Sequence, residues 1–307
     1  MAALCAGSQN TREGRLMRDV SGSADGDAAA ARHVAVEYST DDEWAAHLVP
    51  FVRAGFDRGE QVQYFADATD PRLVIHTLAE RGVDADSAIR RGQLVVTTAD
   101  ETYLIGARFD PDAMIGLWRR AVEAAAGQGY GNLRVIGEMS WGARHITGAE
   151  RLLEYELRIH HEVFEQLPLT AWCFYDRRLL APEALDALVG AHLTRAGTAP
   201  RPHARPGLSV APLAGRPGFR LSGSAGYESR RVAASASAAI AASTVKDITL
   251  DLSGLDHLDV SALADIARAA QRRPSEAPVR LVGAPPVLHR MLELFPELGA
   301  GLQGADQ

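Results

Sequence analysis

The chain has 307 residues, a formal net charge of −7 and 47% hydrophobic residues, which together suggest two domains with ordinary apolar cores. The acidic balance disfavours a nucleic-acid-binding surface, and no apolar run is long enough to span a bilayer. The cysteines are Cys5 and Cys173, so a structural disulfide is not expected and a reducing cytoplasm is favoured.

Residues 1–32 are expected to form a disordered tail. This segment is rich in Gly, Ser, Ala, Asp and Arg and has few large apolar side chains, so it cannot bury enough surface to offset its ordering entropy. It also lacks the long apolar core of a secretory signal. A periodic region follows, which we assign to a first domain over residues 33–193.

The first domain alternates predicted strands with predicted helices. Short apolar runs predict strands at residues 34–39, 62–66, 94–98, 133–139 and 170–176. Helical apolar spacing predicts helices that begin near Asp41, Pro71, Pro111, Ala149 and Pro182. Residues 99–110 are expected to form a loop. This order is typical of a mainly parallel sheet with helices on both faces.

Ligands of open parallel sheets bind beyond the carboxyl ends of the strands, and aromatic groups with a few polar ones suit a small, partly apolar ligand. The candidate ligand-binding residues are His33, Tyr38, Tyr103, Glu138, Trp141, Tyr175 and Asp176. Structural roles stay open beside this one. Trp141 and Tyr175 also fit an apolar core, and a buried Glu138 could pair with Arg134 or Arg177.

Imidazole and thiolate groups raise the question of a metal or haem site formed by His33, Cys173 and His192. Their spacing has no zinc signature. Cys173 alternates within an apolar strand, so a plain buried thiol is the preferred interpretation. The adjacent pair His160 and His161 is expected to be solvated. No metal and no cofactor are therefore predicted.

A linker and a second domain follow the first. Residues 194–207 contain several Pro and Arg residues and predict a linker, and residues 208–303 predict a small α/β domain. LSVAPL and FRLSG predict a hairpin, followed by a helix of mostly small residues. VRLVGA predicts a later strand, and Pro285 and Pro286 begin the final helix.

The middle of the second domain carries its most informative stretch. Residues 248–252 predict a strand and residues 253–257 a turn, and the helix that follows has Asp259 or Ser261 as its N-cap. Ser261 should therefore lie beside free helix N–H groups, which tolerate a phosphate well. Phosphorylation there would also meet the fixed charge of Asp259, so the position suits a switch as well as a simple cap.

The first domain resembles the MEDS family of sensory modules. The resemblance rests on His33 with Tyr38 and on the segments GFDRGEQV, GVDAD, RFDPDAM, RVIGEMSWG, LLEYE and WCFYDRR. It implies a degenerate RecA/KaiC-like fold that senses a small molecule. In active relatives of that fold a Gly-rich loop with Lys-Ser/Thr cradles phosphate, whereas here the first strand leads to STDDEWAA, so no ATP hydrolysis is expected.

The second domain resembles a STAS domain, the module of anti-sigma factor antagonists. The match rests on Asp259-Val260-Ser261-Ala262-Leu263 and on the strand, turn and helix of VRLVGAPPVLHRMLELFPEL. It implies that Ser261 is the phosphoacceptor and that Asp259, Ser261 and Leu263 contact the partner. The implied partner is an anti-sigma factor of the GHKL serine kinase type.

These observations predict a cytoplasmic signalling regulator that is not an enzyme. An α/β MEDS domain would sense an unknown small molecule, and a smaller α/β STAS domain would bind the anti-sigma factor under control of Ser261 phosphorylation. Neither nucleic acid nor a membrane is an expected partner, and a homodimer is allowed but not specified. The alternatives are a ligand-binding sensor or scaffold without a phosphoswitch and, disfavoured by the missing phosphate loop, an enzyme.

Overall fold

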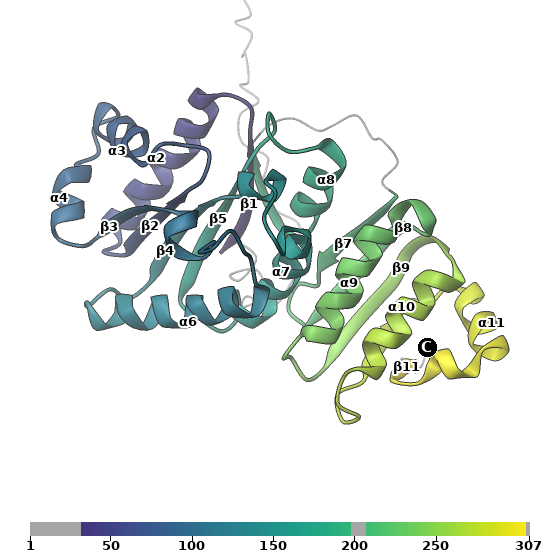
Figure 1. The fold of residues 1–307 in the computed structure, drawn as a ribbon. Helices are drawn as coiled ribbons and strands as arrows, with labels where there is room; N and C mark the ends of the chain where they lie inside the picture. The colour runs from purple at the N-terminus through teal and green to yellow at the C-terminus, as the bar shows by residue number, and fades with distance from the viewer. Residues whose placement is uncertain (1–31, 198–206, 305–307) are drawn as a thin grey trace, which may run out of the picture.

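The computed structural model describes residues 32–197 and 207–304. Apart from Arg32, the expected tail lies outside the described residues, and so do residues 198–206 of the expected linker. The described residues form two α/β units, each built around one sheet (Figure 1).

Within residues 32–197, six parallel strands form one sheet in the order β3-β2-β4-β5-β1-β6. They are β1 (His33–Tyr38), β2 (Gln61–Ala66), β3 (Leu94–Thr98), β4 (Leu133–Glu138), β5 (Leu169–Asp176) and β6 (Thr194–Gly197). The middle strands are apolar on both faces because both faces are covered. Strand β6 pairs with β1, so the first four residues of the expected linker extend this sheet instead.

Helices cover both faces of the six-stranded sheet (Figure 1). One face, which we call the α2 face, packs against α2 (Asp41–Asp57), α3 (Pro71–Glu80) and α4 (Ala85–Arg90). The opposite face, the α7 face, packs against α6 (Pro111–Gly127), α7 (Leu152–Ile159) and α8 (Pro182–Gly190). Each face buries a separate apolar cluster, which confirms the predicted mainly parallel sheet with helices on both sides.

Short polar residues fix where these helices begin. The Thr40 hydroxyl accepts a hydrogen bond from the Glu43 amide at the start of α2. Asp70 and Asp110 cap α3 and α6, and each is followed by a proline whose fixed φ suits the first helical position. The predicted helix starts at Asp41, Pro71, Pro111 and Pro182 therefore agree with the structure.

The second unit contains a five-stranded sheet in the order β11-β10-β9-β8-β7 within residues 207–304. Its strands are β7 (Leu208–Pro212), β8 (Gly218–Ala225), β9 (Ile248–Leu258), β10 (Val279–Val282) and β11 (Leu302–Gly304). Strands β7 and β8 form the predicted antiparallel hairpin, and β8 to β11 pair in parallel. Its helices are α9 (Arg230–Ala242), α10 (Val260–Gln271) and α11 (Pro286–Leu294).

The two units share one apolar core. The cluster on the α7 face continues from α7 and α8 into β7, β8 and α9 of the second unit. In Figure 1, α7 lies between the two units and beside α9. The units are therefore docked along α7 rather than joined only by a tether.

Three local predictions differ from the structure. The expected helix from Ala149 to Glu165 is divided into a 3₁₀ turn (Ala149–Arg151), α7 and a π-helical turn (His160–Phe164). The turn expected at residues 253–257 is part of β9, which continues to Leu258 with register shifts against β8. The loop expected at residues 99–110 begins with a one-turn helix, α5 (Ala99–Thr102), which Thr98 and Glu101 close with a capping box.

No helix within the described residues combines sufficient length with sufficient apolar character to span a membrane.

Candidate functional site

The pleat of the sheet separates the predicted ligand-binding residues, because successive side chains of a strand point to opposite faces. Tyr38, Glu138 and Asp176 lie on the α2 face. There the Tyr64 hydroxyl donates a hydrogen bond to Glu138, and Tyr38 lies close enough to contribute to the raised pKa of Tyr64. His33, Tyr103, Trp141 and Tyr175 belong to the α7 face. The seven residues therefore belong to three groups and do not form one site.

A small aromatic cavity lies on the α7 face of the first domain. Its volume is about 30 Å³, room for roughly two water-sized groups. The lining residues are Phe65, Tyr103, Phe109, Met114, Trp118, Val135, Gly137, Met139, Trp141 and Tyr155. Tyr103 and Trp141 were candidates from the sequence, whereas Phe109, Trp118 and Tyr155, which come from other segments, were missed.

The walls of this cavity are fixed by aromatic packing and one hydrogen bond. The rings of Phe109 and Trp141 have centroids 4.6 Å apart, and Trp118 Nε1 donates a hydrogen bond of 2.7 Å to the Tyr155 hydroxyl. Trp141 is buried, and its Nε1 makes no hydrogen bond of standard geometry among the described residues, although it interacts with the neighbouring Tyr103 hydroxyl and opposes the rise in the pKa of that group. A buried N–H group without a well-formed hydrogen bond is costly, so this atom is a natural position for an acceptor on a ligand.

The rim of the cavity is formed by the segment after α5. Tyr103 is partly exposed, and the neighbouring Ile105 is 70% exposed. Arg144 ties this rim to the sheet, because its guanidinium contacts Asp67 after β2 and donates two hydrogen bonds of 3.0 Å to Asp100 of α5. Neighbouring carboxylates raise the pKa of Arg144 further above its usual value.

Glu138 is held by the protein itself on the α2 face. One carboxylate oxygen accepts hydrogen bonds from three successive backbone amides, those of residues 67, 68 and 69, at 2.8, 2.8 and 3.0 Å. The other oxygen accepts one from the Tyr64 hydroxyl. Of the two partners considered from the sequence, Arg134 pairs instead with Glu60 at 2.6 Å. Glu138 does not line the cavity, whereas its neighbours Gly137 and Met139 do.

Asp176 and Tyr38 close the carboxyl end of the sheet beside α2. Asp176 binds Arg178 through both carboxylate oxygens, and Arg178 also reaches Asp41 at 3.0 Å at the start of α2. Burial, followed by the charges of Glu138 and Asp176, raises the pKa of Tyr38 well above its usual value. The charged side chains of this corner pair with one another, Arg178 with both Asp176 and Asp41.

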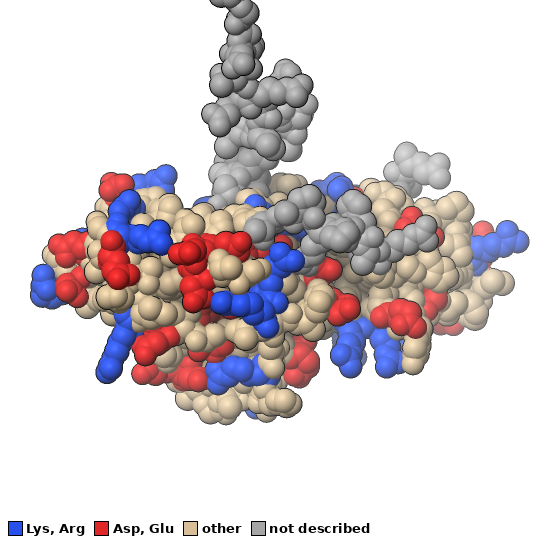
Figure 2. Space-filling model, turned by 90° about the horizontal axis from the view of Figure 1, so that it is seen from above, with Lys and Arg blue, Asp and Glu red and all other residues tan. Residues whose placement is uncertain are grey.

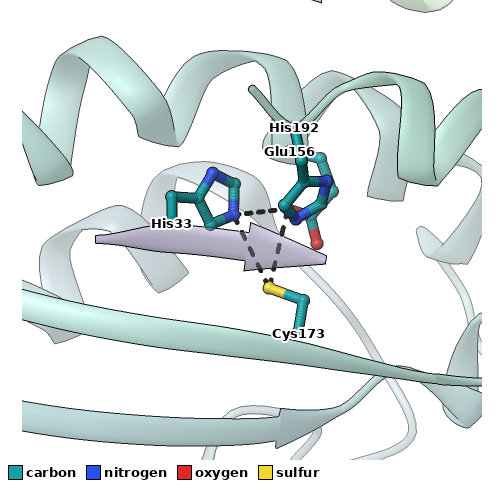
Figure 3. A group of neighbouring side chains, drawn as sticks. All are labelled: His33, Glu156, Cys173 and His192. Carbon is teal, nitrogen blue, oxygen red and sulfur yellow. Dashed lines mark hydrogen bonds and ion pairs between the residues drawn. The ribbon is translucent and has the colours of Figure 1, made fainter. Parts of the chain in front are cut away.

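A third group lies in the interior of the α7 face, and we call it the buried cluster: His33, Glu156, Cys173 and His192 (Figure 3). Glu156 Oε2 lies 3.3 Å from His33 Nε2, 3.5 Å from His192 Nε2 and 4.0 Å from Cys173 Sγ. Cys173 Sγ lies 3.6 Å from His33 Nε2. Cys173 is buried as predicted, but its neighbours are polar.

Burial controls the charges in the buried cluster. It lowers the pKa of His33 and of His192 to about 3, so both imidazoles are neutral near neutral pH. It raises the pKa of Glu156 above the usual range and that of the Cys173 thiol well above its own. Glu156 was missed as a site residue, although a carboxylate on the apolar stripe of LLEYE was the signal that could have found it.

His160 and His161 are buried, with 1% and 3% exposure, so the prediction of a solvated pair was wrong. They follow α7 in the π-helical turn that faces the second domain. His161 Nε2 lies 3.1 Å from the Gly218 carbonyl oxygen, and Glu162 accepts a hydrogen bond of 3.0 Å from the Thr244 hydroxyl. Residues of the second domain therefore contact this turn directly.

In the second domain the three predicted partner-binding residues lie at the start of α10. Asp259 is the N-cap, and its carboxylate accepts a hydrogen bond of 2.8 Å from the Ala262 amide. The exposed Ser261 hydroxyl donates a second hydrogen bond of 2.8 Å to the same carboxylate. The hydrogen bond from the Ala262 amide lowers the pKa of Asp259. Leu263 is 1% exposed and belongs to the core. Tyr227 and Val260, 70% and 43% exposed, are the apolar groups flanking this corner.

Two family models match this chain. Residues 32–193 match MEDS, the MEthanogen/methylotroph, DcmR Sensory domain, and residues 214–296 match the STAS domain described as Mlab. The chain belongs to the MEDS family and carries a STAS domain after it, as the sequence motifs predicted. A sensory domain joined to a STAS domain makes this protein a signalling regulator.

Individual relatives match over parts of the chain. The transcriptional repressor DcmR of Methylorubrum extorquens is 27% identical over 143 residues, which are 46% of this chain and 50% of that protein. The chain therefore spans about half the length of this curated relative. A KaiC-like protein of Pyrococcus horikoshii OT3 is similar in structure, with a TM-score of 0.36 and 14% identity over 48% of this chain and 61% of the other. Likeness at that level carries no argument about activity.

Proposed function

We propose that the first domain binds a small, largely apolar molecule in the aromatic cavity and passes this signal through α7 to the STAS domain. The observation that carries the proposal is the position of α7 and the turn after it. Tyr155 lines the cavity, and His161 and Glu162, within the next two turns, contact Gly218 and Thr244 of the second domain.

The cavity supports a ligand of few heavy atoms. Its volume of about 30 Å³ and its apolar lining favour a short-chain compound, and Trp141 Nε1 offers one hydrogen bond to an acceptor such as an oxygen atom. The partly exposed Tyr103 stands at the rim, where a shift of the segment after α5 would admit a larger molecule. The sensory role given in the family's description supports the same assignment.

The turn after α7 supports transmission to the second domain. A π-helical turn inside a helix is a local irregularity that often occurs at functional sites, since its hydrogen bonds can shift by one residue. A ligand that displaces Tyr155 would move the helix that ends in this turn. Because His161 and Glu162 are buried against the STAS domain, their displacement would alter that domain's docking.

The proposed output is binding of an anti-sigma factor of the GHKL serine kinase type by the STAS domain, in the cytoplasm. Exposed Tyr227 and Val260 flank Ser261 and provide an apolar rim for a partner. Phosphate on Ser261 would lie beside the Asp259 carboxylate, which is already 2.8 Å from the Ser261 hydroxyl, and would add repulsive charge at that rim. Release of the partner on phosphorylation follows from this charge.

We further propose that the chain is not an ATPase and does not bind nucleic acid or membranes. The start of α2, where a phosphate loop would lie, carries Asp41, Asp42 and Glu43, and Glu43 itself accepts a hydrogen bond from the Ser39 amide. On the face shown in Figure 2, Lys and Arg side chains are interspersed with Asp and Glu and form no continuous basic surface.

The full-length chain tests the switch in a pull-down from its native cytoplasm. Wild type, Ser261→Ala and Ser261→Asp are compared by mass spectrometry, with Ser275→Asp as the control because Ser275 is an exposed serine on another loop. We expect wild type, Ser261→Ala and Ser275→Asp to capture a GHKL-type kinase and Ser261→Asp to lose it. Identical partners for all four proteins, with no phosphate on Ser261, would favour a sensor or scaffold without a phosphoswitch.

A further inference from the structure

The buried cluster brings four potential metal ligands together from four separate segments. His33 begins β1, Glu156 lies in α7, Cys173 lies in β5 and His192 follows α8. Each offers one donor atom, and these four atoms all lie within 4.8 Å of one another. Figure 3 shows the side chains converging on one point between the sheet and the helices.

Three of the distances in this cluster lie in the range of a tetrahedral metal site. With metal–nitrogen and metal–oxygen bonds of about 2.0–2.1 Å and a metal–sulfur bond of about 2.3 Å, tetrahedral ligand atoms lie about 3.3–3.6 Å apart. The two N–O separations are 3.3 and 3.5 Å, and the N–S separation is 3.6 Å. The Sγ–Oε2 separation of 4.0 Å is the longest of these contacts and still lies within reach of a shared ion.

Neighbouring groups orient two of the four ligands. His192 Nδ1 lies 3.0 Å from the Leu188 carbonyl oxygen. This contact selects the tautomer with the proton on Nδ1, in which Nε2 carries a free lone pair. That Nε2 faces the cluster and has no hydrogen-bonding partner among the described residues. The Tyr175 hydroxyl donates a hydrogen bond of 3.2 Å to Glu156 Oε1, leaving Oε2 for the centre. Fixing the far atom of a ligand in this way is typical of metal sites.

We propose that His33, Glu156, Cys173 and His192 bind one divalent transition metal ion, with Zn²⁺ as the ion that this donor set fits best. Two imidazoles, a thiolate and a carboxylate in tetrahedral arrangement are the ligand types that zinc selects. Four protein ligands leave no open position, so the site is structural. Binding releases the Cys173 proton to solvent, and the positive charge of the ion compensates the negative charges of the thiolate and the carboxylate.

A nucleophilic role for Cys173 fits the cluster less well. Its residues are between 0% and 6% exposed, so no path for a substrate reaches the sulfur. A metal ion needs no such path once the domain has folded around it. Because Glu156 lies in α7, the ion would also anchor the helix that contacts the second domain, which makes metal binding relevant to signalling whatever the ligand in the aromatic cavity is.

The test uses the full-length protein, loaded with Zn²⁺ for metal analysis and with Co²⁺ after chelator treatment for absorption spectroscopy. We expect on the order of one Zn²⁺ per chain, and a Co²⁺ form with tetrahedral visible bands and a sulfur-to-cobalt charge-transfer band. Cys173→Ser should lose the charge-transfer band and His192→Gln should weaken Zn²⁺ binding by about 10–100-fold or more. The matched controls Cys5→Ser and His76→Gln should behave as wild type.

Wild type alone can overturn the proposal, so it does not depend on the folding of variants. A folded wild-type chain that binds much less than one equivalent of Zn²⁺, with no sulfur-to-cobalt band, would contradict it. Full Zn²⁺ occupancy without that band would also contradict it and would direct attention to His160, His161 and Glu165, a second group of potential ligands without sulfur. Folding is checked by circular dichroism in every case.

Discussion

His161 Nε2 lies 3.1 Å from the carbonyl oxygen and 3.2 Å from the amide nitrogen of Gly218, and this contact joins the turn after α7 to the first residue of β8. The tautomer of His161 decides which of the two groups it bonds. Gly218 has a φ of 142°, and a Cβ there would collide with the Thr249 backbone. The interdomain contact is therefore made at a backbone position that requires glycine.

We expect His161→Ala to destabilise the whole chain by about 1–3 kcal/mol, because a buried hydrogen bond and its packing are lost at the interface. Urea unfolding followed by tryptophan fluorescence and by circular dichroism measures this change. His145→Ala, at an exposed histidine of the first domain, is the control. Equal stability of His161→Ala and wild type would show that this contact does not hold the domains together.

Asp259→Ala should remove the N-cap of α10 and cost about 1 kcal/mol. The tryptophans lie at positions 44, 118, 141 and 172, all in the first domain, so their fluorescence reports on that domain alone. Because one apolar core continues through both domains, we expect the tryptophan transition to shift although the change is in the second domain. A shift seen by circular dichroism alone would mean that the domains unfold separately.

Gly137→Ala tests the aromatic cavity. The added methyl group would meet Met139 Sδ at 3.6 Å, an ordinary contact, and would occupy part of the about 30 Å³ of free space. We expect binding of short-chain alcohols and hydrocarbons, followed by quenching of Trp118 and Trp141, to weaken by about tenfold. Gly131→Ala, where a methyl group meets nothing within 4 Å, should bind them as wild type does.

Lowering the pH should reduce the folding stability of the chain because His160 is buried in its neutral form. Burial lowers its pKa from 6.5 to about 3. The unfolded chain therefore takes up a proton that the folded chain refuses, so stability from this residue is complete above pH 6.5 and is lost as the pH falls towards 3. Between pH 7 and pH 5 the loss is about 2 kcal/mol.

His160→Gln, which has no imidazole to titrate, should lose about 2 kcal/mol less than wild type over that interval when urea midpoints at pH 7 and pH 5 are compared. His76→Gln serves as the control, since His76 is 65% exposed. Identical pH dependence in wild type and His160→Gln would contradict the assignment of a neutral buried imidazole.

Much of the fold could be predicted from local pattern. The apolar runs located β1 to β5 and the hairpin of β7 and β8, and helix-capping residues such as Asp70 and Asp110 fixed where helices begin. Strand β6 was missed because TRAG has no apolar run, and it forms only because β1 offers a free edge. The extension of β9 through SGLDH was missed for a similar reason, since pairing with β8 overrides the turn preference of Gly254.

The candidate sites were only partly predictable. Residues at the strand ends were recognised as functional candidates, but the alternation of side chains placed Glu138 on one face and Gly137 on the other. Three amides after β2 hold Glu138, and backbone groups leave no signal in a sequence. His33 and Cys173 were noted together, whereas Glu156 was added by the packing of α7 on β5.

The sequence by itself determined the two families, the alternating strands and helices, and the position of Ser261 at the start of α10, because these depend on residue types at short spacing. Only the tertiary structure decided that the domains dock along α7, that His160 and His161 are buried, and that the aromatic cavity and the buried cluster exist. These features join residues far apart in the sequence, 57 positions for His161 and Gly218 and 140 positions for His33 and Cys173, and depend on how helices pack across a sheet.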